Sequence, residues 1–150
     1  MKIIRLICIS LVLLTSCTIY QTIPTTESFN SEINLSIDRV ILNNSIAAGN
    51  FSYYARDGYN FAQLKIAFTN KTSEKQELDF EKIFLIDLNS KMKYNLEFCF
   101  LLGPVTLGAR KKITIAPNET LRRILVFVFP ENVKPEYILA NDNLIKITYP

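Results

Sequence analysis

The side chains best suited to covalent chemistry in this sequence are the thiols of its three cysteines, Cys8, Cys17 and Cys99. A nucleophilic thiol needs a neighbouring base, most often histidine, and the 150 residues contain no histidine. Cys99 lies between Phe98 and Phe100, a setting in which a single cysteine is usually a small buried hydrophobic residue. We therefore expect no catalytic role for Cys99.

Three carboxylates that lie close in sequence, Asp79, Glu81 and Asp87, are the next candidates. A calcium site would need more oxygen ligands and a glycine-bearing loop, and a glycosidase pair would need a cleft. The sequence shows neither, and it has no phosphate loop, nucleophile elbow or zinc-ligand spacing. We predict a protein without enzymatic activity, cofactor or metal. A hydrolase that works without histidine is the hypothesis with the least support.

The N-terminal segment has the pattern of a signal peptide. Lys2 and Arg5 precede an apolar run over residues 6–14, and the small residues Thr15 and Ser16 follow it. The run is too short to span a bilayer as a mature helix.

The end of this segment, Leu14-Thr15-Ser16-Cys17, resembles the lipobox of bacterial lipoproteins. The resemblance implies that residues 1–16 are removed and that Cys17 becomes an acylated first residue, which anchors the chain in a membrane. Thr18 in place of an aspartate implies the outer membrane or cell surface rather than the inner membrane. The alternative is an ordinary signal peptide, or a buried N-terminal strand, with a chance cysteine. Residues 17–30 are rich in Thr, Ser, Gln and Asn, and we expect a flexible tether there.

The charge balance argues against nucleic acid as a partner. The chain has 17 basic and 14 acidic residues, a net charge of +3. Without Lys2 and Arg5 the net charge falls to +1, which lacks the basic footprint of a phosphate-binding protein. If Cys17 is acylated and Cys8 removed, Cys99 has no partner for an intramolecular disulfide.

From residue 31 onward, apolar residues recur with the period of two that is typical of β-strands. The segment 124–129 is apolar on both faces, as in a strand that is covered on both sides. Turns are expected at residues 69–73, 89–91 and 116–119. We predict an all-β fold, an antiparallel β-sandwich of about seven or eight strands over residues 31–150. The predicted core is Ile33, Leu35, Ile37, Leu64, Ile66, Phe68, Phe84, Ile86, Leu125, Phe127 and Ile147.

Several segments resemble the small secreted immunoglobulin-like domains of unknown function that occur in bacterial lipoproteins and secreted antigens. They are residues 63–72 (QLKIAFTNKT), 84–87 (FLID) and 125–130 (LVFVFP), with the turn Pro117-Asn118-Glu119. The resemblance implies an immunoglobulin-like sandwich and no particular activity.

Two groups of residues could form an interaction surface. Residues 49–61 hold five aromatic residues, among them Phe51, Tyr53, Tyr54 and Tyr59, and an aromatic loop can serve recognition. The simpler alternative is that these aromatics fold back over the edge of the sandwich. The second group is basic and could converge on an anionic ligand, or it could be an ordinary solvated face: Arg110, Lys111, Lys112, Arg122 and Arg123.

These observations predict a lipid-anchored protein of the bacterial envelope that acts by contact with another envelope protein or a surface ligand. The alternative is a structural envelope component that self-associates through an uncovered edge strand.

Overall fold

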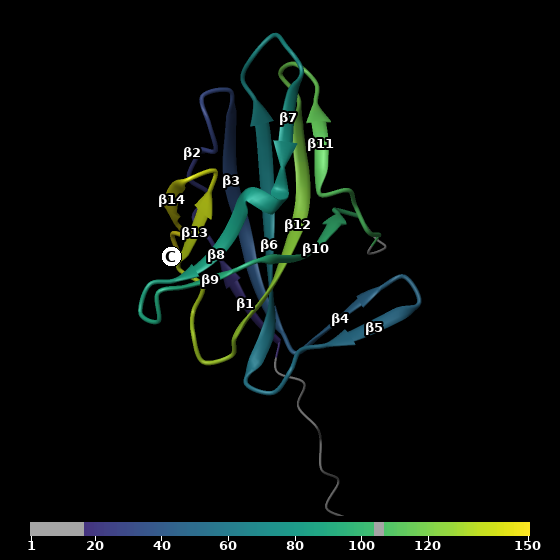
Figure 1. Cartoon of the computed structure of the whole chain (residues 1–150), viewed down its shortest axis with the longest axis vertical. Coiled ribbons are helices and arrows are strands. Elements are labelled where there is room, and N and C mark those ends of the chain that lie inside the picture. Colours follow the sequence, from purple (N-terminus) through teal and green to yellow (C-terminus); the bar gives the residue numbers. More distant parts are fainter. Residues whose placement is uncertain (1–16, 104–106) are drawn as a thin grey trace, which may run out of the picture.

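The computed structural model describes residues 17–103 and 107–150, and the strands in them form antiparallel sheets (Figure 1). The all-β antiparallel class predicted from the sequence is confirmed. The largest sheet, here called the main sheet, has the strand order β1-β3-β6-β12-β10, with β2 beside β3. Its strands are β1 (Cys17–Gln21), β2 (Glu27–Ser28), β3 (Ile33–Asn43), β6 (Tyr59–Asn70), β12 (Thr120–Pro130) and β10 (Leu96–Leu101).

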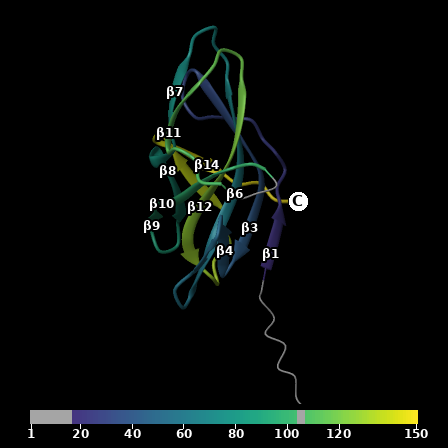
Figure 2. The ribbon, with the colours of Figure 1, turned by 90° about the vertical axis from the view of Figure 1, so that its right-hand side faces the viewer.

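A second layer packs on one face of the main sheet. It contains a four-stranded sheet in the order β14-β13-β8-β9 and the pair β11-β7, which Figure 2 shows from the side. Its elements are β7 (Gln76–Asp79), the 3-10 turn η1 (Phe80–Lys82), β8 (Ile83–Asp87), β9 (Met92–Tyr94), β11 (Lys112–Ile115), β13 (Tyr137–Ala140) and β14 (Asn143–Lys146). A separate hairpin consists of β4 (Ser45–Ala48) and β5 (Phe51–Tyr54).

The main core lies between these two layers and contains side chains from both. In β3, the buried residues Ile33, Leu35 and Ile37 alternate with more exposed ones, as predicted. The pairing with β6 shifts at Asp38, so that the buried positions continue at Val40 and Leu42. An extra residue of this kind is a β-bulge, which changes the phase of the alternation and lets the long strand keep facing one core.

β12 is apolar on both faces, as its sequence predicts. Leu125, Phe127 and Phe129 belong to the main core, whereas Val126 belongs to a second, smaller cluster on the opposite face of the sheet. A strand that buries side chains on both faces needs a cover on each face. The second cover is the β4–β5 hairpin, because Ile46 of β4 is buried in that smaller cluster.

The predicted core residues are buried, with the exception of Phe84. In β8 it is Ile83 and Leu85 that point into the main core, and Phe84 is half-buried with the Lys93 ammonium 5.6 Å from its ring centre. Phe84 was wrongly predicted because hydrophobicity alone did not fix the phase of this strand, in which three consecutive residues from Phe84 are apolar.

The structure differs from the flexible tether that we expected over residues 17–30. Residues Cys17–Gln21 form β1, which pairs with the residues 39–43 of β3, and Glu27–Ser28 form β2. The Thr22 hydroxyl donates a 2.6 Å hydrogen bond to the Ile37 carbonyl, and the ring of Tyr20 packs edge-on against that of Tyr149. This segment is therefore part of the main sheet, where backbone hydrogen bonds stabilise it in spite of its polar composition.

The strands are more numerous than expected: the described part of residues 31–150 contains twelve, β3 to β14, instead of seven or eight. The predicted turns are present: β6 ends at Asn70, and Asn118 adopts a φ of 56°, the left-handed conformation that asparagine tolerates. In the β8–β9 turn it is Lys91, with a φ of 58°, that takes the left-handed conformation.

Asn70 is fully buried at the end of β6, and its amide group forms hydrogen bonds with two separate segments of the chain. Its Nδ2 donates to the carbonyls of Glu74 (2.7 Å) and Ala116 (3.1 Å), and its Oδ1 accepts from the backbone N–H and the hydroxyl of Thr72 (both 2.9 Å). Asn70 thus joins the β6–β7 loop to the end of β11.

Replacing Asn70 by alanine should lower the free energy of unfolding by about 2 kcal/mol, because several buried or half-buried polar groups lose their partner. Urea denaturation followed by circular dichroism measures the change. The exposed Asn132→Ala is the matched control and should shift stability by less than about 0.5 kcal/mol. Equal effects of the two substitutions would contradict the role of Asn70.

Candidate interaction surface

Cys17 is exposed and lies at the start of β1, where it pairs with Asn43, the last residue of β3. Asn43 in turn pairs with Phe61 in β6, and Phe61 pairs with Val128 in β12, so these four residues form one row of paired residues across the main sheet. Because neighbouring strands lie about 4.8 Å apart, the backbone of Cys17 is about 10 Å from that of Phe61. The signal peptide predicted for residues 1–16 lies outside the described residues.

The β4–β5 hairpin starts immediately beyond this row. Asn44 separates β3 from β4, and its carbonyl accepts a 2.8 Å hydrogen bond from the N–H of Ala55, which closes the root of the hairpin. Gly49 in the connecting turn has a φ of 60°, a conformation that a glycine adopts without strain. Figure 1 shows the hairpin standing out sideways from the end of the domain at which β1 begins.

The hairpin packs through aromatic side chains onto the outer face of the main sheet. The Tyr53 ring centre lies 4.9 Å from that of Phe98, and Phe98 is stacked on Phe100 at 5.7 Å. Phe61 contacts Phe98 edge-on at 6.2 Å. The hairpin is thus held on the sheet by the Tyr53–Phe98 contact, together with Ile46, which is buried in the same cluster.

The rest of the hairpin surface is exposed. Phe51 is 69% exposed and Tyr54 is 76% exposed, while Tyr53 is 38% exposed. The expected alternative, in which these aromatics fold back over the sandwich, holds in part for Tyr53. A hollow of about 460 Å³ opens beside them and is lined by Tyr53, Tyr54, Ala55, Arg56, Phe61, Glu97, Phe98 and Val128.

Tyr59 does not belong to this exposed group. It begins β6 and is half-buried, and the Arg56 guanidinium lies 3.8 Å from the centre of its ring. The N–H of Tyr59 also donates a 3.0 Å hydrogen bond to the Arg56 carbonyl. Tyr59 and Arg56 therefore stabilise the turn between the hairpin and β6.

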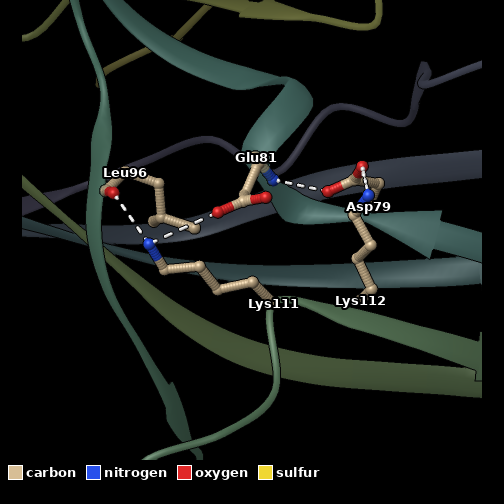
Figure 3. A network of polar contacts seen from close by, with 5 residues as sticks. All are labelled: Asp79, Glu81, Leu96, Lys111 and Lys112. Carbon is tan, nitrogen blue, oxygen red and sulfur yellow. Dashed lines mark hydrogen bonds and ion pairs between the residues drawn. The ribbon is translucent and has the colours of Figure 1, made fainter.

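The five basic residues do not form one free cationic surface. Lys112 forms an ion pair with Asp79 at 3.1 Å, and Lys111 lies 3.6 Å from the Glu81 carboxylate and donates to the Leu96 carbonyl (Figure 3). The hydrogen bond to the Asp79 carboxylate raises the pKa of the Lys112 ammonium above its usual range. Two of the five charges are thus balanced by acidic neighbours.

The two arginines of β12 point to opposite faces of the main sheet, because consecutive residues of a strand alternate. Arg122 is exposed, whereas Arg123 is partly buried and its Nη1 donates to the Arg122 carbonyl at 2.8 Å. Arg110 is exposed in the segment before β11. An anionic ligand therefore meets separate cations rather than a cluster.

Each of the three carboxylates has a structural partner. Asp79 and Glu81 pair with the two lysines, and Asp79 also accepts a 3.0 Å hydrogen bond from the N–H of Glu81 at the start of η1. Asp87 is buried and accepts hydrogen bonds from the Asn89 N–H (3.0 Å) and the Ser90 hydroxyl (2.6 Å). Within the described residues, no group of histidine, cysteine and acidic residues is arranged to hold a metal ion.

Cys99 is buried in the main core, as predicted. Burial raises the pKa of its thiol to about 11, against the smaller opposing effects of Arg123 and Lys111. A thiol with so high a pKa is protonated at neutral pH and is a poor nucleophile.

Sequence reasoning missed the contribution of Phe98 and Phe100 to the outer face. Alternate residues of a strand share a face, so a buried Cys99 that faces the main core places Phe98 and Phe100 together on the opposite face. The two apolar faces of residues 124–129 were the second signal that something must cover the outer side of the sheet.

This fold is similar to that of solved structures of uncharacterised proteins. A conserved hypothetical protein from Bacillus anthracis is 17% identical, and the match covers 87% of this chain and 96% of that protein with a TM-score of 0.65. A functionally unknown protein from Listeria monocytogenes is 12% identical, with coverage of 83% and 74% and a TM-score of 0.57. An uncharacterized β-sandwich protein from Clostridium difficile is 14% identical, with coverage of 76% and 80% and a TM-score of 0.48.

Comparison with family models and with curated proteins gives no match. The resemblance to secreted immunoglobulin-like domains therefore stays a prediction from the sequence. In the part of the chain that the structure describes, no helix is long and apolar enough to cross a bilayer. The structural likenesses extend to the β-sandwich fold and not to an activity.

The thiol of Cys99 should make stability depend on alkaline pH. The pKa of the thiol is about 11 in the folded protein and about 8.5 in an unfolded chain. The protonated thiol therefore contributes fully to the free energy of unfolding below about pH 8.5, and this contribution is lost as the pH rises toward about 11. The stability difference between the wild type and Cys99→Ala should therefore narrow over this interval. Urea midpoints measured at several pH values test this, and a constant difference would contradict it.

Proposed function

We propose that this chain is a lipid-anchored protein of the bacterial envelope, held by acyl chains on Cys17, and that its β-sandwich acts by contact rather than by catalysis. The outer membrane or the cell surface is the proposed location. The contact would be with another envelope protein or a surface ligand.

The observation that carries the proposal is the position of Cys17. It follows a basic and apolar segment with a lipobox-like end, and it is exposed at one end of the domain, where an enzyme at the membrane surface could reach it. Two or more acyl chains on one residue are sufficient for stable membrane attachment, whereas one is marginal. Because β1 begins at Cys17, an acylated Cys17 would hold the domain against the leaflet without a spacer.

Support for a contact function comes from the surface beside Cys17. Phe51 and Tyr54 expose large aromatic areas on the β4–β5 hairpin, and exposed apolar surface of this kind marks interaction sites. The candidate groups for catalysis have structural roles instead: the carboxylates are paired, and the Cys99 thiol is buried and protonated.

A second candidate function, self-association, is favoured by β1. This strand lies at the end of the main sheet, and no strand of the described residues pairs with its outer edge. Within β1, the side chain of Ile19 is about half exposed. At the other end of the sheet, the Ala109 N–H donates to the Cys99 carbonyl (2.8 Å), which partly covers the edge of β10. β1 is thus the edge that another chain could extend.

Acylation of Cys17 should be detectable by growing cells that express the full chain with radiolabelled palmitate. The wild type should carry label that resists neutral hydroxylamine, because the acyl chains are joined to the glyceryl group by oxygen esters and not to the thiol by a thioester. Cys17→Ser should carry no label. Cys99→Ser is the matched control and should keep the label. Label on Cys17→Ser, or none on the wild type, would refute lipid anchoring.

If β1 mediates self-association, the detergent-solubilised full chain should be at least a dimer by light scattering, and Ile19→Lys should shift it to the monomer, because an edge charge opposes strand pairing. Leu144→Lys, at a residue of similar exposure in β14, is the control and should leave the mass unchanged. A monomeric wild type would exclude this candidate.

A further inference from the structure

The β4–β5 hairpin lacks charge in a way that is unusual for so exposed an element. Residues 40–55 contain no lysine, arginine, aspartate or glutamate, although 21% of the chain is charged. In this stretch Phe51 and Tyr54 expose 69% and 76% of their surface. Charged side chains normally keep such a projecting hairpin in water and prevent its edges from pairing.

The root of this hairpin is directly beside Cys17. Asn43 pairs with Cys17, and the next residue, Asn44, closes the hairpin root through its hydrogen bond to Ala55. The opposite end of β3 is different: Ile33 pairs with Asn70, ten residues away from the row of Cys17. At about 3.3 Å per residue, the two ends of this strand are about 33 Å apart. The uncharged aromatic hairpin and the anchoring residue thus share one end of the domain.

From this juxtaposition we infer that the occupant of the hairpin surface is the lipid leaflet itself, with Phe51 and Tyr54 lying at the boundary between headgroups and acyl chains. The inference rests on the proposed acylation of Cys17 and adds a second attachment site to it. Tyrosine suits this depth because its ring is apolar and its hydroxyl can remain hydrated.

The geometry gives the hairpin a specific role. A single anchor at Cys17 leaves the tilt of the domain free, and a second contact to one side restricts it. Figure 1 shows that the hairpin projects to one side of the start of β1, with β5 along its lower edge. The guanidinium of Arg56, just after the hairpin, lies over the Tyr59 ring, so the hairpin contact with the leaflet depends on apolar surface rather than on charge. The hairpin therefore fixes which face of the sandwich points away from the membrane.

The absence of tryptophan from the chain allows a direct test. Phe51→Trp in the full chain introduces a single reporter at the hairpin, and Ser73→Trp introduces one in the exposed β6–β7 loop at the opposite end of the domain. Each acylated protein is reconstituted in vesicles of phosphatidylethanolamine and phosphatidylglycerol, and its fluorescence is compared with that in vesicles whose acyl chains are brominated near the headgroup.

The Phe51→Trp protein should show a blue-shifted emission and strong quenching by the brominated lipid, and the Ser73→Trp protein should show neither. High salt should not reverse the shift, because the hairpin carries no charge to be screened. An emission at Phe51→Trp like that of exposed tryptophan, or equal quenching at both positions, would overturn the inference. A shift only in native membranes, and not in vesicles of pure lipid, would also overturn it in favour of a protein partner.

Mass spectrometry of the same preparations separates failure of this inference from failure of the proposed function. A protein that carries acyl chains on Cys17 but leaves the hairpin reporter in water refutes the hairpin contact alone. A protein without acyl chains refutes the lipid anchor on which both depend. Circular dichroism of both variants should match that of the wild type, since Phe51 and Ser73 are exposed.

Discussion

The backbone ladder between β1 and β3 joins the N-terminal part of the domain to the main sheet. It incorporates the residues from Cys17 to Gln21 into the main sheet and places the cysteine in one row with Asn43 and Phe61. The chain then passes through Asn44 directly into the β4–β5 hairpin. A backbone pairing of five residues thereby determines which surface of the domain is closest to the proposed anchor.

Much of the fold was predictable because buried and exposed side chains alternate along a half-buried strand, and this alternation is visible in the sequence. The positions Ile33, Leu35 and Ile37 were identified correctly, and so was the two-sided burial of residues 124–129. The strand β1 was missed because its polar composition suggested a linker, although Thr18, Ile19 and Tyr20 are good strand formers. An edge strand needs little buried area of its own when a neighbouring strand supplies the backbone hydrogen bonds.

The candidate site was less predictable, since it depends on contacts between distant segments. The aromatic residues of the hairpin were identified, but their stacking partner Phe98 lies more than forty residues further along the chain. The basic residues were identified as a group, yet Asp79 and Glu81 neutralise two of them across the β7–β11 pair.

Hydrogen exchange of the membrane-bound full chain, measured on peptides that cover residues 17–30, tests whether β1 is a fixed strand of the main sheet. If β1 is a strand of the main sheet, the amides that face β3 exchange slowly, with protection close to that of β3 itself. If the segment is instead a flexible tether, its amides exchange at the rate of an unstructured peptide, and the domain has no fixed position relative to the lipid.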